Sequence, residues 1–258
     1  MSTEIIHLSL WRFSLIYLLL LGILFVMKKC QINQSKLVII ASVRMTLQLV
    51  FTGLILTFIF DNPHPIFTLL YLLAMTWFSI HLALGKHTWL NPKFKRVVSL
   101  SLAFSGWAVM IFYLVFVVGV SIFNPQYAIP ITGMILGNAT SGVTVGLKTL
   151  NDNIKSNRAR IDTLINMGVS PAKAMLPIVH KSIETATLPT VVSMLSMGII
   201  SLPGMMTGQI LSGTYPLTAI LYQISIIIAI SAVTFLGVFA SLYLGYRTLY
   251  NERNQLEI

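Results

Sequence analysis

Apolar positions along the chain gather into long runs that are separated by short polar segments. Each run has close to the roughly 20 residues that a helix needs to cross a bilayer, whereas the strands of a membrane barrel would alternate apolar and polar positions. The pattern predicts an all-α integral membrane protein with about seven transmembrane helices. The predicted spans are residues 8–27, 37–60, 66–84, 97–123, 128–147, 185–206 and 217–246.

The composition agrees with this prediction. The 258 residues are 56% hydrophobic and 9% charged, whereas a soluble domain carries roughly 25% charged residues. We therefore expect one transmembrane domain over residues 1–258, with no room for a sizeable soluble domain. The first apolar run is too long for a signal peptide and lacks a small-residue cleavage site, so it is predicted to remain as a span. Cys30 is the single cysteine, which excludes an intramolecular disulfide.

Lysine and arginine residues predict the orientation of the spans. The net charge is +10, but the basic residues lie in short loops, which indicates the positive-inside rule rather than nucleic-acid binding. All of the 17 basic residues except Arg12 fall on one side of the seven-span arrangement. The N-terminus is therefore predicted outside and the C-terminus in the cytoplasm. A cytoplasmic loop then lies between the fifth and sixth spans, at about residues 148–184.

Within that loop, residues 161–181 are predicted to form a helix, a break and a second helix. Gly168 can end a helix because glycine tolerates positive φ. Ser170 can cap the next helix, with Pro171 at its first position. The second helix mixes apolar and basic side chains, which are Ala172, Ala174, Met175, Ile178 and Val179 with Lys173, His180 and Lys181. Such a helix suits docking into a groove of a soluble partner, or else it lies on the lipid surface.

The predicted span 128–147 combines small and polar residues. Its glycines occur in pairs four positions apart, a spacing that lets helices approach closely: Gly133, Gly137, Gly142 and Gly146. The same span carries the polar side chains Asn138, Thr140 and Ser141. These residues indicate a packed seam between helices, or a transport pathway or dimer face, and the two interpretations are compatible.

The predicted span 185–206 is rich in methionine. Thioethers are soft ligands that suit copper(I) or similar ions. Methionine is also a common filler of packing surfaces, and we favour packing because no Cys or His accompanies these residues. The pathway or gate candidates are Met194, Met197, Met205 and Met206, with Gln209 just beyond the span. Pro203 and Gly204, with Gly208, are candidates for a hinge. The sequence assigns no metal site.

No motif for catalysis is present in the sequence: no nucleophile elbow, no Walker sequence and no metal-hydrolase motif. The seven acidic residues lie mostly in loops and at span ends. We expect no catalytic residue, no cofactor bound by this chain and no enzyme activity of its own. Any ATP-driven step would come from a separate subunit.

Three strings carry a family resemblance: IPITGMILGNATSGVTVGL at 129–147, GVSPAKA at 168–174 and SLPGMMTGQILSG at 201–213. Through them the chain closely resembles the FetB/YbbM-type permeases, most strongly over about residues 128–223. These are membrane subunits of a bacterial ABC transporter assigned to iron export and metal resistance, and plant relatives are linked to aluminium tolerance. The resemblance implies a multi-pass protein of the bacterial cytoplasmic (inner) membrane.

The resemblance also implies partners and a mechanism. Two permease chains, a homodimer, are expected to pair with two cytoplasmic ATPase chains, which bind the ATP and Mg. Asp162, Gly168 and Ile178 fall near the spacing of the ATPase-docking loop of ABC permeases, with Asp where Glu is usual. The docking residues implied are Asp162, Gly168, Val169, Ser170, Pro171, Ala174 and Ile178. Residues 169–181 would transmit ATPase closure to the neighbouring spans in an alternating-access cycle.

Two other functions stay open. An ABC permease could carry a lipid or an organic solute, since no residues here form a clear iron site. Alternatively, the chain could work alone as an ion-coupled carrier, a class that usually places acidic residues at mid-membrane. Here only Glu184 is a candidate, and it lies near the end of a predicted span.

Overall fold

The computed structural model describes residues 9–85 and 87–250, and over these residues the chain is helical without a strand. The all-α prediction is therefore confirmed. The chain divides into two compact units, residues 1–62 with 211–213 and residues 63–210 with 214–258. In chain order the helices are α1 (Leu10–Ser14), α2 (Ile16–Lys29), α3 (Ser35–Asp61), α4 (Pro65–Leu84), α5 (Pro92–Phe112), the π-helix η1 (Tyr113–Val118), α6 (Pro125–Ser156), α7 (Arg158–Asn166), α8 (Pro171–Ser196), α9 (Gly204–Leu211), α10 (Pro216–Gly245) and the 3₁₀ helix η2 (Tyr246–Leu249).

Six helical segments among the described residues are long and apolar enough to cross a membrane. They match six of the seven predicted spans and are Trp11–Lys29, Ser35–Asp61, Pro65–Leu84, Pro92–Val118, Pro125–Ser156 and Pro216–Leu249. The prediction of a continuous span at 185–206 differs from the structure, because α8 ends at Ser196 and α9 begins only at Gly204. The seven-span count and the outward N-terminus stay predictions.

The break between α8 and α9 is a tight turn. Gly198 has φ +87°, a left-handed conformation that favours glycine. Its N–H donates to the Ser201 carbonyl at 2.9 Å, and the Ser196 carbonyl accepts from the Ile200 N–H at 2.9 Å. The turn thus pairs the carbonyl of Ser196, which the end of α8 would otherwise leave open.

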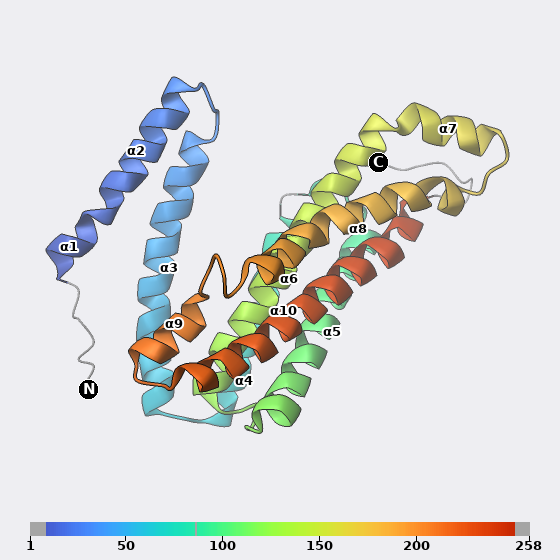
Figure 1. The fold of residues 1–258 in the computed structure, drawn as a ribbon. Helices are drawn as coiled ribbons and strands as arrows, with labels where there is room; N and C mark the ends of the chain where they lie inside the picture. Colours follow the sequence, from blue (N-terminus) through green and yellow to red (C-terminus); the bar gives the residue numbers. More distant parts are fainter. Residues whose placement is uncertain (1–8, 86, 251–258) are drawn as a thin grey trace. The chain divides into compact units, whose positions relative to one another are not determined.

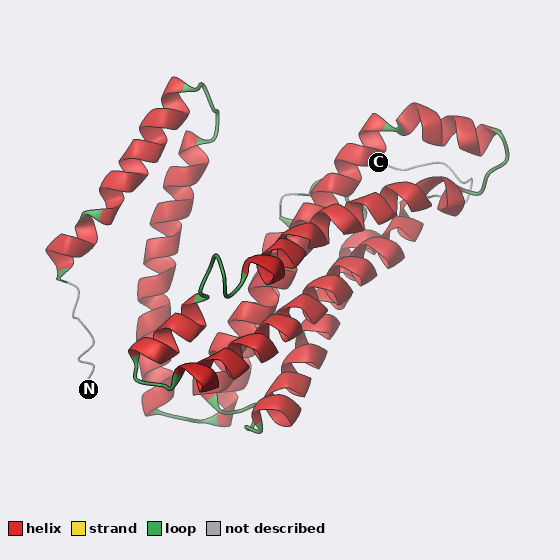
Figure 2. Cartoon of the chain, in the orientation of Figure 1, coloured by secondary structure: helices red, strands yellow, loops and turns green. Residues whose placement is uncertain are grey.

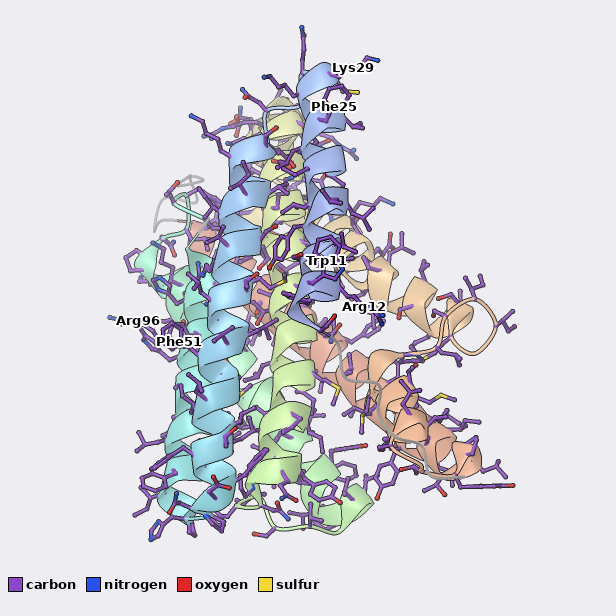
Figure 3. The ribbon with its side chains drawn as sticks, turned by 90° about the vertical axis from the view of Figure 1, so that its left-hand side faces the viewer. Trp11, Arg12, Phe25, Lys29, Phe51 and Arg96 are labelled. Atoms are coloured by element: carbon purple, nitrogen blue, oxygen red, sulfur yellow. The ribbon has the colours of Figure 1, made fainter. Side chains whose placement is uncertain are left out.

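In the first unit, α2 and α3 form a helical hairpin, and the hydroxyl oxygens of Tyr17 and Thr46 lie 2.8 Å apart across it. Apolar side chains project outward from both helices, as Phe25 and Phe51 do in Figure 3, with 70% and 62% of their surfaces exposed. A helix pair with so much outward apolar surface suits a lipid environment. Lys29 ends α2, and Arg12 lies near the other end of this α1–α2 segment (Figure 3).

In the second unit, α6 and α10 are the central helices. α10 packs against α5, α6 and α8, and α6 also packs against α4, α5 and α8 (Figure 1 and Figure 2). Glycine permits this approach, since a Cβ atom at Gly142 would lie 2.7 Å from Thr234 Cγ2, and one at Gly146 would lie 3.0 Å from Leu242 Cδ1. The packed seam that the glycine spacing predicts is confirmed at these two positions.

The described Lys and Arg residues of the second unit gather at one end of its bundle. That end holds α7, the C-terminal halves of α6 and α10, and the N-terminal halves of α5 and α8 (Figure 1). The basic residues are Lys93, Lys95, Arg96, Lys148, Lys155, Arg158, Arg160, Lys173, Lys181 and Arg247. The loops at the other end, residues 119–124 and 214–215, contain neither Lys nor Arg. The positive-inside rule would place this end in the cytoplasm, and the orientation itself stays a prediction.

The α6–α10 contact makes Gly142 sensitive to any added side chain. Gly142→Leu would force carbon atoms into the space that Thr234 and Val238 occupy, and overpacking of this kind costs about 1–3 kcal/mol or more. We expect a clear fall in the apparent melting temperature of the purified protein in detergent. Gly53→Leu on α3 is the matched control, because a Cβ atom at Gly53 meets nothing within 4 Å. Equal losses for both variants would contradict the packing described.

Candidate functional site

A cavity of about 180 Å³ lies in the second unit among α6, α8 and α10. Polar side chains from two helices face it, and Pro189 and several apolar residues complete its lining. The lining residues are Asn138, Ser141, Gly142 and Val145 of α6, Ala186, Pro189, Thr190 and Ser193 of α8, and Ile227 and Ile230 of α10. The structure thus brings two of the sequence-predicted pathway residues, Asn138 and Ser141, together with Thr190 and Ser193, which sequence reasoning missed.

The polar groups of this cavity are neutral oxygens. Asn138 donates its side-chain N–H to the Met134 carbonyl at 2.8 Å, which leaves the Asn138 side-chain oxygen as an acceptor. The Ser141 hydroxyl donates to the Gly137 carbonyl at 3.0 Å and likewise keeps an acceptor oxygen. Such oxygens can coordinate a cation weakly or bind a polar solute.

Thr140, the third polar residue predicted for the pathway, lies outside this cavity. It is buried, and its hydroxyl oxygen lies 2.5 Å from that of Ser79 on α4. The Thr140 hydroxyl donates to the Leu136 carbonyl at 2.6 Å, so Ser79 donates to Thr140. Thr140 therefore joins α6 to α4, on the packing side of the helix.

The methionines lie on two separate elements. The Ser231 hydroxyl donates to the Ile227 carbonyl at 2.7 Å, and its oxygen lies 3.1 Å from the Met194 sulfur. The Met197 sulfur accepts a hydrogen bond from the Gln223 amide at 3.8 Å. These contacts tie the end of α8 to α10. Met205, the buried Met206 and the half-buried Gln209 lie on α9, which Pro203 precedes and Gly204 begins. Within the described residues, no group of three or more His, Cys, Asp or Glu side chains could hold a metal ion.

The predicted helix, break and helix at 161–181 is confirmed. α7 ends at Asn166, Gly168 has φ +87°, and α8 begins at Pro171. Ser170 occupies the N-cap position, but its side chain makes no capping hydrogen bond; its carbonyl accepts from the N–H groups of Lys173 and Ala174 at 2.9 and 3.0 Å. α8 then continues unbroken to Ser196, so the predicted docking helix and the helix that lines the cavity are one element.

Burial divides the predicted docking residues into three groups. Asp162, Gly168 and Ser170 are exposed, whereas Val169, Pro171 and Ile178 are half-buried. Ala174 is only 5% exposed and packs inside the chain, so it cannot be part of a docking surface in this conformation. Sequence reasoning did not select Met167, which lies directly before the break and is 76% exposed. The sequence feature that could have identified Met167 is an apolar residue next to a helix-ending glycine in a polar loop.

The C-terminal segment holds the start of α8 in place. The Tyr250 hydroxyl donates to the Pro171 carbonyl at 3.3 Å, and the Asn91 side-chain amide donates to the Thr248 carbonyl. Burial raises the pKa of the Tyr250 phenol, and Tyr246 and the Asp162 carboxylate add to the rise. A neutral Tyr250 therefore links the C-terminal segment to the break between α7 and α8.

Comparisons with known proteins place the chain among membrane proteins. The model of a family described as "Uncharacterised protein family (UPF0014)" matches residues 10–250. The UPF0014 membrane protein YjkA of Bacillus subtilis is 29% identical over 95% of this chain and 96% of its own length. The Escherichia coli protein named "Probable iron export permease protein FetB" is 32% identical over 83% of this chain and 82% of its own.

A plant relative extends the comparison. Protein ALUMINUM SENSITIVE 3 of Arabidopsis thaliana is 33% identical over 83% of this chain and 77% of its own length. No solved structure matches the chain. The resemblance to the FetB-type permeases that the three sequence strings carry is confirmed by these relatives.

Stability should depend on the protonation of Tyr250 at alkaline pH. Because the folded-state pKa is raised, the contribution of Tyr250 is fully present below the unfolded value of ~10 and is lost as the pH rises above it. Tyr250→Phe should therefore reduce the loss of thermal stability between about pH 9 and 11, measured as the melting temperature in detergent. Tyr215→Phe, at an exposed tyrosine, is the control. The same change of melting temperature with pH in wild type and both variants would refute the effect.

Proposed function

Since the chain belongs to the UPF0014 family, we propose that it is the membrane-spanning subunit of an ABC transporter that exports iron or another metal. The relative FetB carries the name of a probable iron export permease, and similarity over most of both chains supports the same role here. ATP and Mg would bind to a separate ATPase subunit. This chain would contribute no catalytic residue, and it would lie in the bacterial inner membrane.

One observation carries the proposal, namely the continuity of α8. The helix begins at the exposed break beside Met167 and reaches the cavity at Thr190 and Ser193 without interruption. At 1.5 Å per residue, the 26 residues of α8 form a lever of about 39 Å. An ATPase that docks on Met167, Gly168 and Asp162 would therefore move the wall of the cavity directly.

A second copy of the chain would complete the pathway. Asn138 and Ser141 are exposed on α6 in the single chain, although α6 is one of the membrane-spanning candidates. Lipid tails offer no hydrogen bonds, so polar side chains within a span face a neighbouring helix or a water-filled pathway. A symmetric homodimer around this face of α6 would supply both the neighbouring helix and the pathway.

The ion-coupled carrier has less support. Glu184, its one candidate for binding a driving ion, pairs with Lys181 at 3.6 Å, and both side chains are 70% exposed. A lipid or organic solute as the cargo of an ABC permease would need a larger apolar cavity than the one described. Neutral oxygens in a small cavity suit a cation that must bind weakly enough to leave.

The docking segment can be tested through Met167. Met167→Glu places a charge on the exposed apolar residue at the break, so we expect co-purification of the ATPase subunit to fall by about tenfold or more. Metal-stimulated ATPase activity of the complex should fall with it. Ser156→Glu adds the same charge at the end of α6 and should leave both readouts unchanged. Undiminished ATPase recovery with Met167→Glu would refute docking at this segment.

The proposed dimer face can be tested with single cysteines in a Cys30→Ser background. Ser141→Cys should give a disulfide-linked dimer after oxidation of native membranes, because a two-fold axis near α6 brings the two copies of residue 141 together. Phe104→Cys on α5, where the native side chain is 79% exposed, should stay monomeric. Equal cross-linking at both positions would show that α6 is not the dimer contact.

A further inference from the structure

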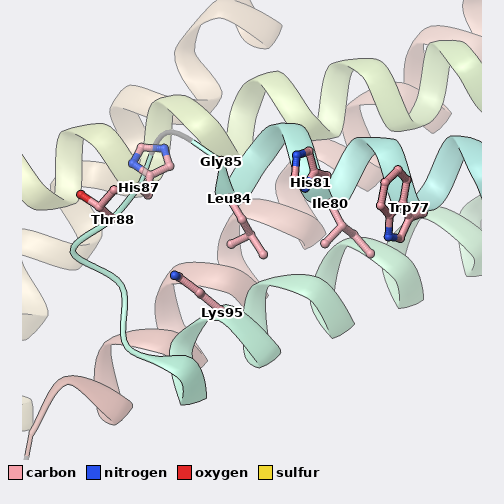
Figure 4. Close-up of a pocket in the computed structure, with 8 residues that line it drawn as sticks. All are labelled: Trp77, Ile80, His81, Leu84, Gly85, His87, Thr88 and Lys95. Atoms are coloured by element: carbon pink, nitrogen blue, oxygen red, sulfur yellow. The ribbon is translucent and has the colours of Figure 1, made fainter.

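A second and larger cavity of the second unit lies at its basic end, with a volume of about 320 Å³. It is formed by the C-terminal part of α4, the loop that follows and the first turn of α5 (Figure 4). None of the residues that line it belongs to the proposed pathway or docking segment. Its walls include Trp77, Ile80, His81, Leu84, Thr88 and Lys95.

The lining of this cavity is apolar on one side and polar on the other. Trp77, Ile80 and Leu84 come from α4, whereas Thr88 comes from the loop and Lys95 from α5 (Figure 4). The rings of Trp77 and His81 stack, with centroids 5.5 Å apart and an interplanar angle of 13°. An amphipathic ligand with a small polar group matches this division.

The charge at Lys95 selects the sign of that polar group. Lys95 is half-buried, and the ion pairs among the described residues are Arg158–Asp162 and Lys181–Glu184, so no described carboxylate neutralises it. Lys95 also lies in the first turn of α5, where the helix dipole adds positive potential. In Figure 4 its side chain points from α5 toward the end of α4 and the loop that follows. An anion in the cavity would meet this uncompensated charge.

We propose that this cavity binds a phosphate group, with Lys95 as the countercharge and His81 and Thr88 as hydrogen-bonding partners. The apolar wall identifies the carrier as an anionic phospholipid, whose acyl chains would cover Trp77 and Ile80. Tryptophan is enriched at membrane interfaces, and basic pockets between spans on the cytoplasmic side bind anionic headgroups. Free inorganic phosphate shares the chemistry of the headgroup but would leave the apolar wall uncovered.

The test is native mass spectrometry of the full chain, titrated with phosphatidylglycerol and, as a zwitterionic comparison, with phosphatidylcholine. Wild type should bind phosphatidylglycerol more tightly, and Lys95→Gln should weaken that binding about fivefold. Lys95→Arg should retain it. Lys93→Gln removes an exposed charge two residues away, outside the cavity lining, and should change little.

Competition distinguishes the two sources of phosphate. If inorganic phosphate displaces phosphatidylglycerol from wild type but not from Lys95→Gln, the cavity recognises the phosphate group itself. If inorganic phosphate displaces no phosphatidylglycerol while Lys95→Gln still weakens lipid binding, the site is specific for the lipid. Equal affinity of wild type, Lys95→Gln and Lys93→Gln for phosphatidylglycerol, with unchanged melting temperatures, would overturn the proposal.

Discussion

The close approach of α6 to α8 and α10 is the contact on which the second unit depends. A Cβ atom at Gly142 would lie too close to Thr234, and one at Gly146 would press tightly against Leu242 and Ala186. Without a hydrophobic driving force between helices in lipid, such tight backbone contact is a main source of cohesion. The same contact sets α8 beside α6, so that the polar side chains on the adjoining faces of the two helices line one cavity.

That cavity owes its chemistry to neutral groups. Asn138, Ser141, Thr190 and Ser193 contribute oxygens without formal charge, and the acidic Glu184 lies outside its lining in an exposed ion pair. A permanent carboxylate at such a site would hold a multivalent cation tightly and oppose its release. In the transporter proposed above, a neutral lining would leave the timing of binding and release to movement of the helices.

Sequence patterns could predict the helices and the break at Gly168, because long apolar runs and glycine next to Ser-Pro have direct local causes. They could not predict the break at Gly198, since an isolated glycine in an apolar run is tolerated within membrane helices. Nor could they separate Ala174 from Met167. Both are apolar residues of one loop, and only packing against the rest of the unit buries Ala174 and leaves Met167 exposed. Asn138 and Thr140 differ for the same reason, because residues two positions apart in a helix point in different directions.

The two ends of α8 explain how this helix can transmit movement. At its start, Tyr250 and the buried Ala174 hold it against the bundle. At its end, the sulfur atoms of Met194 and Met197 contact Ser231 and Gln223 of α10, and sulfur is soft and adaptable. Beyond them the turn at Gly198 separates α8 from α9. If the proposed docking at the start of α8 is right, a displacement there would move the cavity wall, and the weak sulfur contacts and the turn are the parts that could yield.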